Sequence, residues 1–105
     1  MKYITLVCAG GMSTSILVKK MQDAARKEEI EVSIIAMSES SFASYKEPTD
    51  VLLLGPQVGY LLSDMKKEYE PAGMKVEMID MLSYGRMDGP KVLHMALDLM
   101  ACAGK

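Results

Sequence analysis

The spacing of apolar residues changes along the chain, and these changes predict alternating strands and helices. Short apolar runs at 3–7 and 50–55 are typical of strands, and the second suits a strand buried on both faces. The run at 31–37 predicts a further strand, and the less apolar run at 74–79 suits an edge strand. Apolar residues recur every three or four positions over 14–28, over 57–69 and from 90 onward, which predicts amphipathic helices.

This order of elements predicts an α/β fold of a single domain, 1–105: a three-layer αβα arrangement with a four-stranded parallel sheet of order 2-1-3-4. We expect Ser38 to cap a short helix over 38–45, and Pro90 to occupy the first position of the last helix. Residues 80–89 predict a loop with room for one helical turn. In such a sheet the ligand binds outside the carboxyl ends of the strands, here where the loops 8–15, 55–59 and 80–89 meet.

Composition and charge narrow the function classes. The chain has 105 residues, half of them hydrophobic, and a net charge of −2, which argues against the basic surface of a nucleic-acid-binding protein. The two cysteines, Cys8 and Cys102, lie far apart and form no CxxC pair, so we expect a reducing compartment and no disulfide. No apolar run has the length of a signal peptide core or of a membrane span. The sequence therefore predicts a cytoplasmic protein.

Cys8 is the residue most indicative of chemistry, because it ends the first strand and is followed by a loop rich in Gly, Ser and Thr and then by a helix. A helix start offers unpaired N–H groups and a partial positive charge, which favour an anion and the thiolate form of a nearby cysteine. We predict that Cys8 is a nucleophile that carries a phosphoryl group, with its sulfur ionised and reachable. The phosphate-binding residues predicted with it are Ala9, Gly10, Gly11, Met12, Ser13, Thr14 and Ser15. One of the three hydroxyl residues at 13–15 is expected to cap the helix.

Residues on the neighbouring loops are expected to support this site. Gln57, Tyr84 and Asp88 are predicted to help order the thiophosphate or a docking face, and Met12, Val58 and Met87 to form an apolar docking patch. Asp80 and Asp88 are expected to cap or turn the chain rather than to act as an acid or base. His94, the single histidine, is expected to be a solvated surface residue. Nothing in the sequence requires a metal or an organic cofactor.

The loop also resembles the phosphate loop of cysteine phosphatases, Cys-x-x-x-x-x-Arg-Ser/Thr, and the expected fold resembles theirs. Ser15 fits the last position, but Thr14 stands where that motif has arginine. Without arginine no bidentate charge holds the transition state, and no Asp-Pro loop is evident to supply a general acid. Transfer is therefore favoured over hydrolysis. A low-molecular-weight phosphatase-like hydrolase and a non-enzymatic, anion-binding regulatory domain remain alternatives.

Several segments together resemble one protein family over essentially the whole chain. They are LVCAGGMSTSILVKKM at 6–21, DVLLLGPQVGYLL at 50–62, VEMIDMLSYGRMDG at 76–89 and a closing helix. In these segments the chain is similar to the IIB component of the bacterial phosphotransferase system (PTS), in its lactose/cellobiose branch. Cys8-Ala9-Gly10-Gly11 looks closer to lactose-type members, whereas Met12–Ser15 matches the cellobiose/chitobiose type, which the resemblance favours.

The resemblance implies a specific role and specific partners. A phosphohistidine on a soluble IIA protein gives its phosphoryl group to Cys8. Phospho-Cys8 then passes the group to a disaccharide bound by the membrane-embedded IIC protein. The sugar is phosphorylated as it enters the cell, and the contacts with IIA and IIC are transient.

Overall fold

A computed structural model describes residues 2–8, 12–45 and 49–103. Four parallel strands form one sheet of order β2-β1-β3-β4, as the sequence predicted. The strands are β1 (Lys2–Cys8), β2 (Val32–Ser38), β3 (Val51–Leu54) and β4 (Lys75–Met78). The helices are α1 (Met12–Lys27), α2 (Glu39–Ala43), η1 (Pro56–Leu61), α3 (Leu62–Tyr69), η2 (Glu70–Ala72), α4 (Met81–Gly85) and α5 (Gly89–Ala103).

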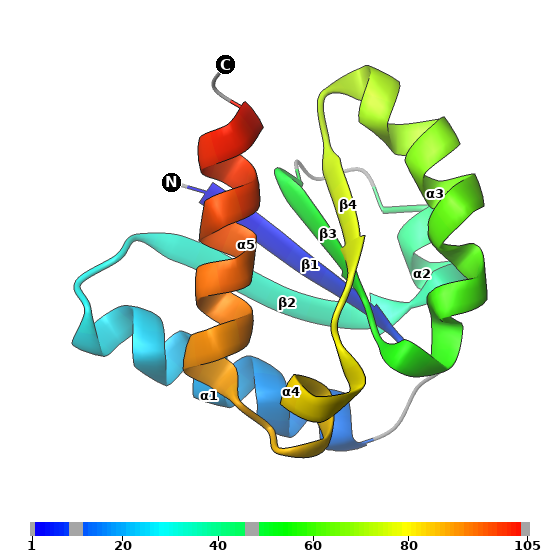
Figure 1. Ribbon diagram of the computed structural model, residues 1–105. Coiled ribbons are helices and arrows are strands. Elements are labelled where there is room, and N and C mark those ends of the chain that lie inside the picture. Colours follow the sequence, from blue (N-terminus) through cyan, green and yellow to red (C-terminus); the bar gives the residue numbers. More distant parts are fainter. Residues whose placement is uncertain (1, 9–11, 46–48, 104–105) are drawn as a thin grey trace.

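The sheet lies between two layers of helices, which completes the expected three-layer arrangement (Figure 1). Alternate residues of the central strand β3 face opposite layers because successive strand side chains point to opposite faces. Val51 and Leu53 join the core under α1 and α5, and Leu52 and Leu54 join the core under α2 and α3. None of the four retains any exposed surface, so β3 is fully enclosed, as its continuous apolar run predicted.

The boundaries of several elements differ from those predicted. α1 begins at Met12 rather than at 14, and the segment predicted as one helix over 57–69 is a 3₁₀ helix, η1, followed by α3. The turn α4 forms within the predicted loop 80–89, and α5 begins at Gly89, so Pro90 is its second residue. Ser38 caps α2 as expected, because its Oγ accepts a hydrogen bond from the Ser41 N–H at 3.2 Å.

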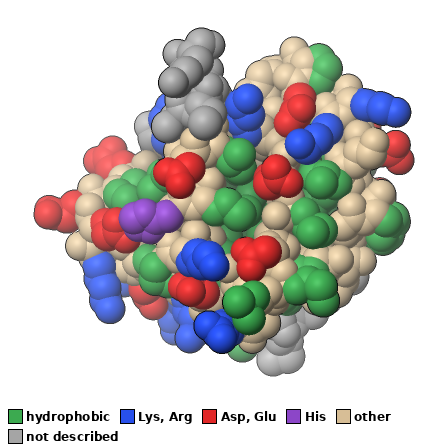
Figure 2. Space-filling view, viewed as in Figure 1, with side chains coloured by type: hydrophobic (Ala, Val, Ile, Leu, Met, Phe, Trp, Pro, Cys, Tyr) green, Lys and Arg blue, Asp and Glu red, His purple; other side chains and the backbone are tan. Residues whose placement is uncertain are grey.

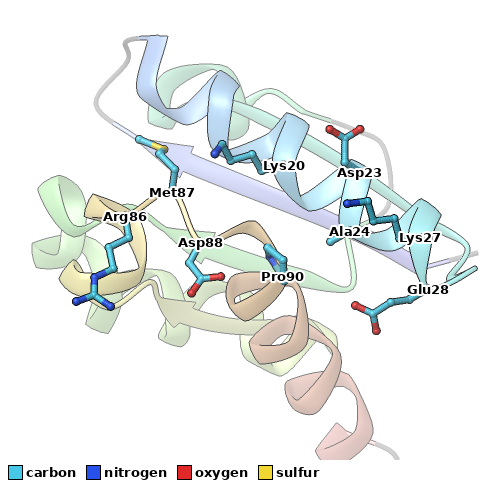
Figure 3. A pocket seen from close by; sticks show the side chains of 9 residues that line it. All are labelled: Lys20, Asp23, Ala24, Lys27, Glu28, Arg86, Met87, Asp88 and Pro90. Carbon is cyan, nitrogen blue, oxygen red and sulfur yellow. The ribbon is translucent and has the colours of Figure 1, made fainter.

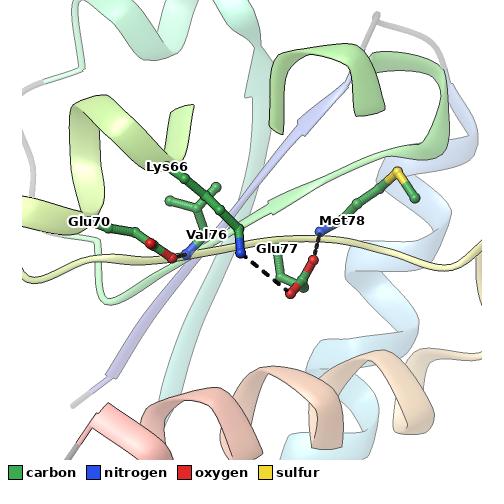
Figure 4. A network of polar contacts seen from close by, with 5 residues as sticks. All are labelled: Lys66, Glu70, Val76, Glu77 and Met78. Carbon is green, nitrogen blue, oxygen red and sulfur yellow. Dashed lines mark hydrogen bonds and ion pairs between the residues drawn. The ribbon is translucent and has the colours of Figure 1, made fainter. Parts of the chain in front are cut away.

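Strand β4 is an edge of the sheet, as predicted, and acidic side chains occupy its outward N–H groups (Figure 4). The Val76 N–H donates to Glu70 Oε2 at 3.5 Å, and the Met78 N–H donates to Glu77 Oε1 at 3.0 Å. Lys66 Nζ lies 4.0 Å from the other oxygen of Glu77. An edge strand with free N–H groups invites pairing with another chain, and these contacts reduce that tendency.

The two helices of one layer approach closely at Gly89. A methyl group placed on its Cα would lie 2.6 Å from both the carbonyl carbon and Cβ of Lys20, and 2.8 Å from the Lys20 oxygen. Much of that contact is with backbone, which cannot rotate away as a flexible side chain can. Glycine at position 89 therefore sets how near the start of α5 lies to α1.

This close approach gives a first prediction. Gly89→Ala should reduce the free energy of unfolding by about 1–3 kcal/mol, because the added methyl group forces the helices apart. The measurement is urea unfolding followed by circular dichroism. Gly85→Ala is the matched control, since a methyl group there meets nothing within 4 Å, and it should leave stability unchanged or slightly raised. Equal stability of the two variants would contradict the assigned packing.

Candidate functional site

Cys8 is the last residue of β1 and lies between the ends of two neighbouring strands. It pairs with Ser38 on β2, and on the other side the Gly55 N–H donates to the Val7 carbonyl at 2.9 Å. Cys8 is 6% exposed, so its side chain is largely covered, whereas the sequence led us to expect a readily reachable sulfur.

Gly55 brings together three of the residues that the sequence predicted for the site. A methyl group on its Cα would lie 3.6 Å from Cys8 Cβ, 3.6 Å from Tyr84 Cε2 and 3.0 Å from Gln57 Oε1. These residues come from the segments after β1, β3 and β4, so the three predicted loops do meet at one end of the sheet. Gly55 itself begins the predicted rim loop 55–59, although it was not among the predicted site residues.

The first turn of α1 differs from the expectation that one of its hydroxyl residues caps the helix. Because α1 begins at Met12, residues 13–15 lie inside the first turn, and an N-cap precedes the first helical residue. The capping assignment is therefore wrong. Thr14 is buried, and its Oγ1 lies 2.9 Å from the Tyr84 hydroxyl oxygen, in a hydrogen bond between residues far apart in sequence. Its hydroxyl is thus directed to α4, while Ser15 is exposed.

The structure describes only part of the predicted phosphate-binding segment 9–15, whose backbone N–H groups would form a cradle for the phosphoryl group. Ala9, Gly10 and Gly11 lie outside the described residues, whereas residues 12–15 form the first turn of α1, a position that offers N–H groups without helical partners. The arrangement of strand end, thiol and helix start has the order and elements that the sequence predicted.

Two aspartates on the third loop have local structural roles. Asp80 caps α4, and the hydrogen bond from the Ser83 N–H to its carboxylate, 2.9 Å long, lowers the pKa of Asp80. Asp88 precedes α5, and its Oδ1 accepts from the Lys91 N–H at 3.2 Å. The caps expected of Asp80 and Asp88 are both confirmed, and the cap at Asp88 orients the start of α5.

Asp88 also lines a hollow of about 590 Å³ between α1 and the α4–α5 connection (Figure 3). Lys20, Asp23 and Lys27 project from α1 on one side, and Arg86 and Asp88 lie on the other. The lining mixes both charge signs and does not include Cys8.

The predicted apolar docking patch requires a correction. Val58, a residue of η1, is buried. Its side chain packs with the core residues Leu54 and Val7, so it offers no surface to a partner. Met87 is half-buried against the other core, and the Met12 side chain lies outside the described part. Large exposed apolar side chains occur instead on the segments after β1, β3 and β4: Ile16 at 50%, Tyr60 at 76%, Met81 at 75% and Leu82 at 56% exposed.

The surface charge agrees with the small net charge of the chain. On the face shown in Figure 2, acidic and basic side chains alternate and no broad basic area forms. Within the described ranges no helix has the length and apolar character needed to cross a membrane. Among the same residues no three His, Cys, Asp or Glu side chains gather as metal ligands would.

His94 lies on the exposed side of α5 as expected, and it pairs with the end of α1. Its Nε2 is 2.8 Å from Glu28 Oε2, and this hydrogen bond, with the Glu28 charge, raises the pKa of His94. Asp98, one helical turn further along, acts weakly in the same direction.

Comparisons with known proteins decide the family. A family model described as the lactose/cellobiose-specific IIB subunit of the PTS system matches residues 3–95. The chain belongs to this family. It is 41% identical over 100 residues to an oligo-beta-mannoside-specific EIIB component of Bacillus subtilis, covering 95% of this chain and 97% of the relative. It is 44% identical over 104 residues to a galactose-specific EIIB component of Lactococcus lactis, covering 94% of this chain and 96% of the relative.

Solved structures agree with this IIB assignment. A cellobiose-specific IIB protein from Borrelia burgdorferi aligns with a TM-score of 0.79 at 33% identity, covering 97% of this chain and 94% of that one. A lactose-specific IIB domain from Streptococcus pneumoniae aligns with a TM-score of 0.83, covering 92% of this chain and 95% of that one, and at 20% identity it supports the fold alone.

The His94–Glu28 pair predicts a pH-dependent contribution to the stability of this IIB subunit. Because the folded state raises the His94 pKa above its ordinary value of 6.5, protonated His94 stabilises the fold. The contribution is fully present below that value and is lost as the pH rises through the folded pKa. The stability difference between the parent chain and His94→Ala, from urea midpoints, should therefore shrink between about pH 6 and about pH 8. Glu28→Gln should flatten the same dependence, and a difference that stays constant with pH would contradict the pairing.

Proposed function

We propose that this IIB subunit is a phosphoryl carrier that works in the cytoplasm through Cys8. It accepts the group from a phosphohistidine of a IIA protein and passes it to a disaccharide bound by a membrane IIC protein. The observation that carries the proposal is the location of Cys8 at the end of β1, beside Gly55 and Tyr84, in a chain that belongs to the IIB family.

The chemistry consists of two displacements at phosphorus. In the first, the Cys8 thiolate attacks in line, an S–P bond forms, and the P–N bond breaks, leaving the electron pair on the histidine nitrogen of IIA. In the second, a sugar hydroxyl attacks, an O–P bond forms, the S–P bond breaks and the thiolate is regenerated. The hydroxyl proton passes to a base or water in the acceptor site. Such transfer depends mainly on position and electrostatics, which N–H groups at the start of α1 are suited to supply.

The surroundings of Thr14 favour transfer over hydrolysis. Thr14 stands where a phosphatase loop would have arginine, and its hydroxyl is held by Tyr84 rather than by solvent. A neutral buried pair at this position supplies no positive charge for attack by water on the phosphocysteine. The charge needed in the transition state would then come from the partner protein.

The relatives agree on the IIB component but differ in the sugar for which they are named. Three curated relatives are named for oligo-beta-mannosides, galactose and cellobiose, at 41%, 44% and 44% identity. Overall identity therefore does not separate these sugars. The match of Met12–Ser15 to the cellobiose/chitobiose type supports a disaccharide of that kind as the acceptor.

The exposed apolar residues suggest where the partners dock. Tyr60, Met81 and Leu82 lie on segments that follow β3 and β4, at the end of the sheet where Cys8 lies. Single exposed apolar residues are common on protein surfaces, whereas apolar residues that gather in one patch mark an interaction site, and these three share one end of the sheet. A modest apolar surface suits contacts that form and release in turn with two partners.

The carrier role predicts that Cys8→Ser abolishes acceptance of a phosphoryl group while leaving the fold intact. The measurement is the mass of the intact chain after incubation with phosphorylated IIA, with circular dichroism as the check on folding. Cys102→Ser is the matched control and should be phosphorylated normally, because it removes the other cysteine of the chain. Normal labelling of Cys8→Ser would overturn the proposal. Rapid hydrolysis of aryl phosphates by the parent chain alone would favour the phosphatase alternative instead.

The docking surface gives a separate prediction. Met81→Asp should lower the transfer rate at limiting phospho-IIA about tenfold, the effect of roughly 1.4 kcal/mol of lost binding. The rate at which a small alkylating reagent modifies Cys8 should not change. Ala72→Asp places the same charge on an exposed position before β4, at the opposite end of the sheet, and should transfer normally. Equal transfer rates for the two variants would show that Met81 lies outside the docking surface.

A further inference from the structure

Tyr84 and Thr14 form a buried contact between two segments that both border Cys8. The two hydroxyl oxygens are 2.9 Å apart, and the residues are 8% and 3% exposed. Thr14 lies in the first turn of α1, and Tyr84 lies on α4. A hydroxyl left unpaired at this depth costs about 1–3 kcal/mol, so the pair has a strong preference for this geometry.

The backbone around Tyr84 is firmly anchored. The Tyr84 N–H donates to the Asp80 carbonyl at 3.0 Å, and the Met87 N–H donates to the Tyr84 carbonyl at 3.1 Å. At the end of β4, the Ile79 N–H donates to the Leu54 carbonyl at 2.8 Å, which joins this segment to β3. The backbone that carries Tyr84 is therefore held in place relative to the sheet.

The Tyr84 ring also borders the nucleophile. A methyl group on Gly55 would lie 3.6 Å from both the Tyr84 ring and Cys8 Cβ, so a single small residue separates them. Tyr84 thus contacts Thr14 through its hydroxyl, while its ring packs close to the end of β1. One side chain therefore links the neighbourhood of Cys8 to the first turn of α1.

The pair also determines where the Thr14 hydroxyl points. A threonine within a helix can otherwise direct its hydroxyl to a carbonyl three or four residues earlier, which bends the helix. In this structure Thr14 Oγ1 is 2.9 Å from the Tyr84 oxygen, so whichever hydroxyl donates, the Thr14 side chain is turned toward α4. Because the Thr14 hydroxyl is held on α4, the first turn of α1 is fixed in position against α4, and the positions of its N–H groups are fixed with it.

We infer that Tyr84 is a positioning residue for phosphoryl transfer, which acts through Thr14 to aim the first-turn N–H groups of α1 at the group carried by Cys8. The inference rests on the proposed carrier function. Tyr84 makes no contact with the phosphoryl group in this assignment. Its hydroxyl keeps the cradle in the geometry that favours both the thiolate and its phosphorylated form.

The test uses Tyr84→Phe, which removes the hydroxyl and keeps the ring. At saturating phospho-IIA the single-turnover transfer rate should fall about tenfold, and the pH midpoint for alkylation of Cys8 should move upward. Thr14→Val should have the same effects, and Thr14→Ser should restore most of the rate. The double variant should be little slower than either single one, because the two residues act as one unit.

Two controls separate positioning from general stability. Tyr45→Phe removes a tyrosine hydroxyl in the opposite layer, and Val76→Ala weakens that core; both should keep the parent rate and alkylation profile. If Tyr84→Phe lowers the unfolding temperature but leaves the rate and the alkylation midpoint unchanged, Tyr84 is merely structural and the inference is wrong. The alkylation profile needs no phosphoryl group, so it tests the inference separately. Phosphorylation of Cys8→Ser would instead defeat the carrier function itself.

Discussion

The parallel hydrogen bonding of β1 between β2 and β3 is the constraint on which the rest of the molecule depends. Parallel strands end at the same edge of a sheet, so the segments after β1, β3 and β4 all emerge there. The bonds from the Gly55 N–H to Val7 and from the Ile79 N–H to Leu54 extend this alignment past the strand ends. Backbone pairing alone therefore brings Cys8 close to Gly55 and Tyr84, without any attraction between their side chains.

The enclosure of β3 makes that pairing hard to shift. Leu53 belongs to one core and Leu54 to the other. A shift of the β3 pairing by one residue would turn each side chain to the opposite face, where it would not fit the helices packed there. The free edge at β4 is limited in another way, by Glu70 and Glu77 on its outward N–H groups. The sheet therefore presents its loop end in a fixed arrangement, with two N–H groups of the β4 edge already paired.

The sequence predicted the strands, their order and the meeting of three loops, because burial on one or both faces imposes spacings that can be read locally. It did not predict the roles within the first turn of α1. Ser and Thr are favoured both as caps and as first-turn residues, and the choice for Thr14 was decided by Tyr84, a residue far away in sequence. Val58 failed for another reason: its place on the loop after β3, near Cys8, led to the docking assignment, whereas its side chain packs into the core with Val7 and Leu54.

A neutral pair at the position of the phosphatase arginine has a consequence for a carrier. Arginine would add two charge-assisted hydrogen bonds to the phosphoryl oxygens and so stabilise the phosphocysteine itself as well as its transition state. A carrier needs the group to leave again for a second acceptor, and only stabilisation that is stronger in the transition state speeds that step. The bond between Thr14 and Tyr84 supplies orientation without charge. Under the proposed carrier role, such a site would hold the resting phosphocysteine less tightly, and a charged group brought by each partner in turn would determine when transfer occurs.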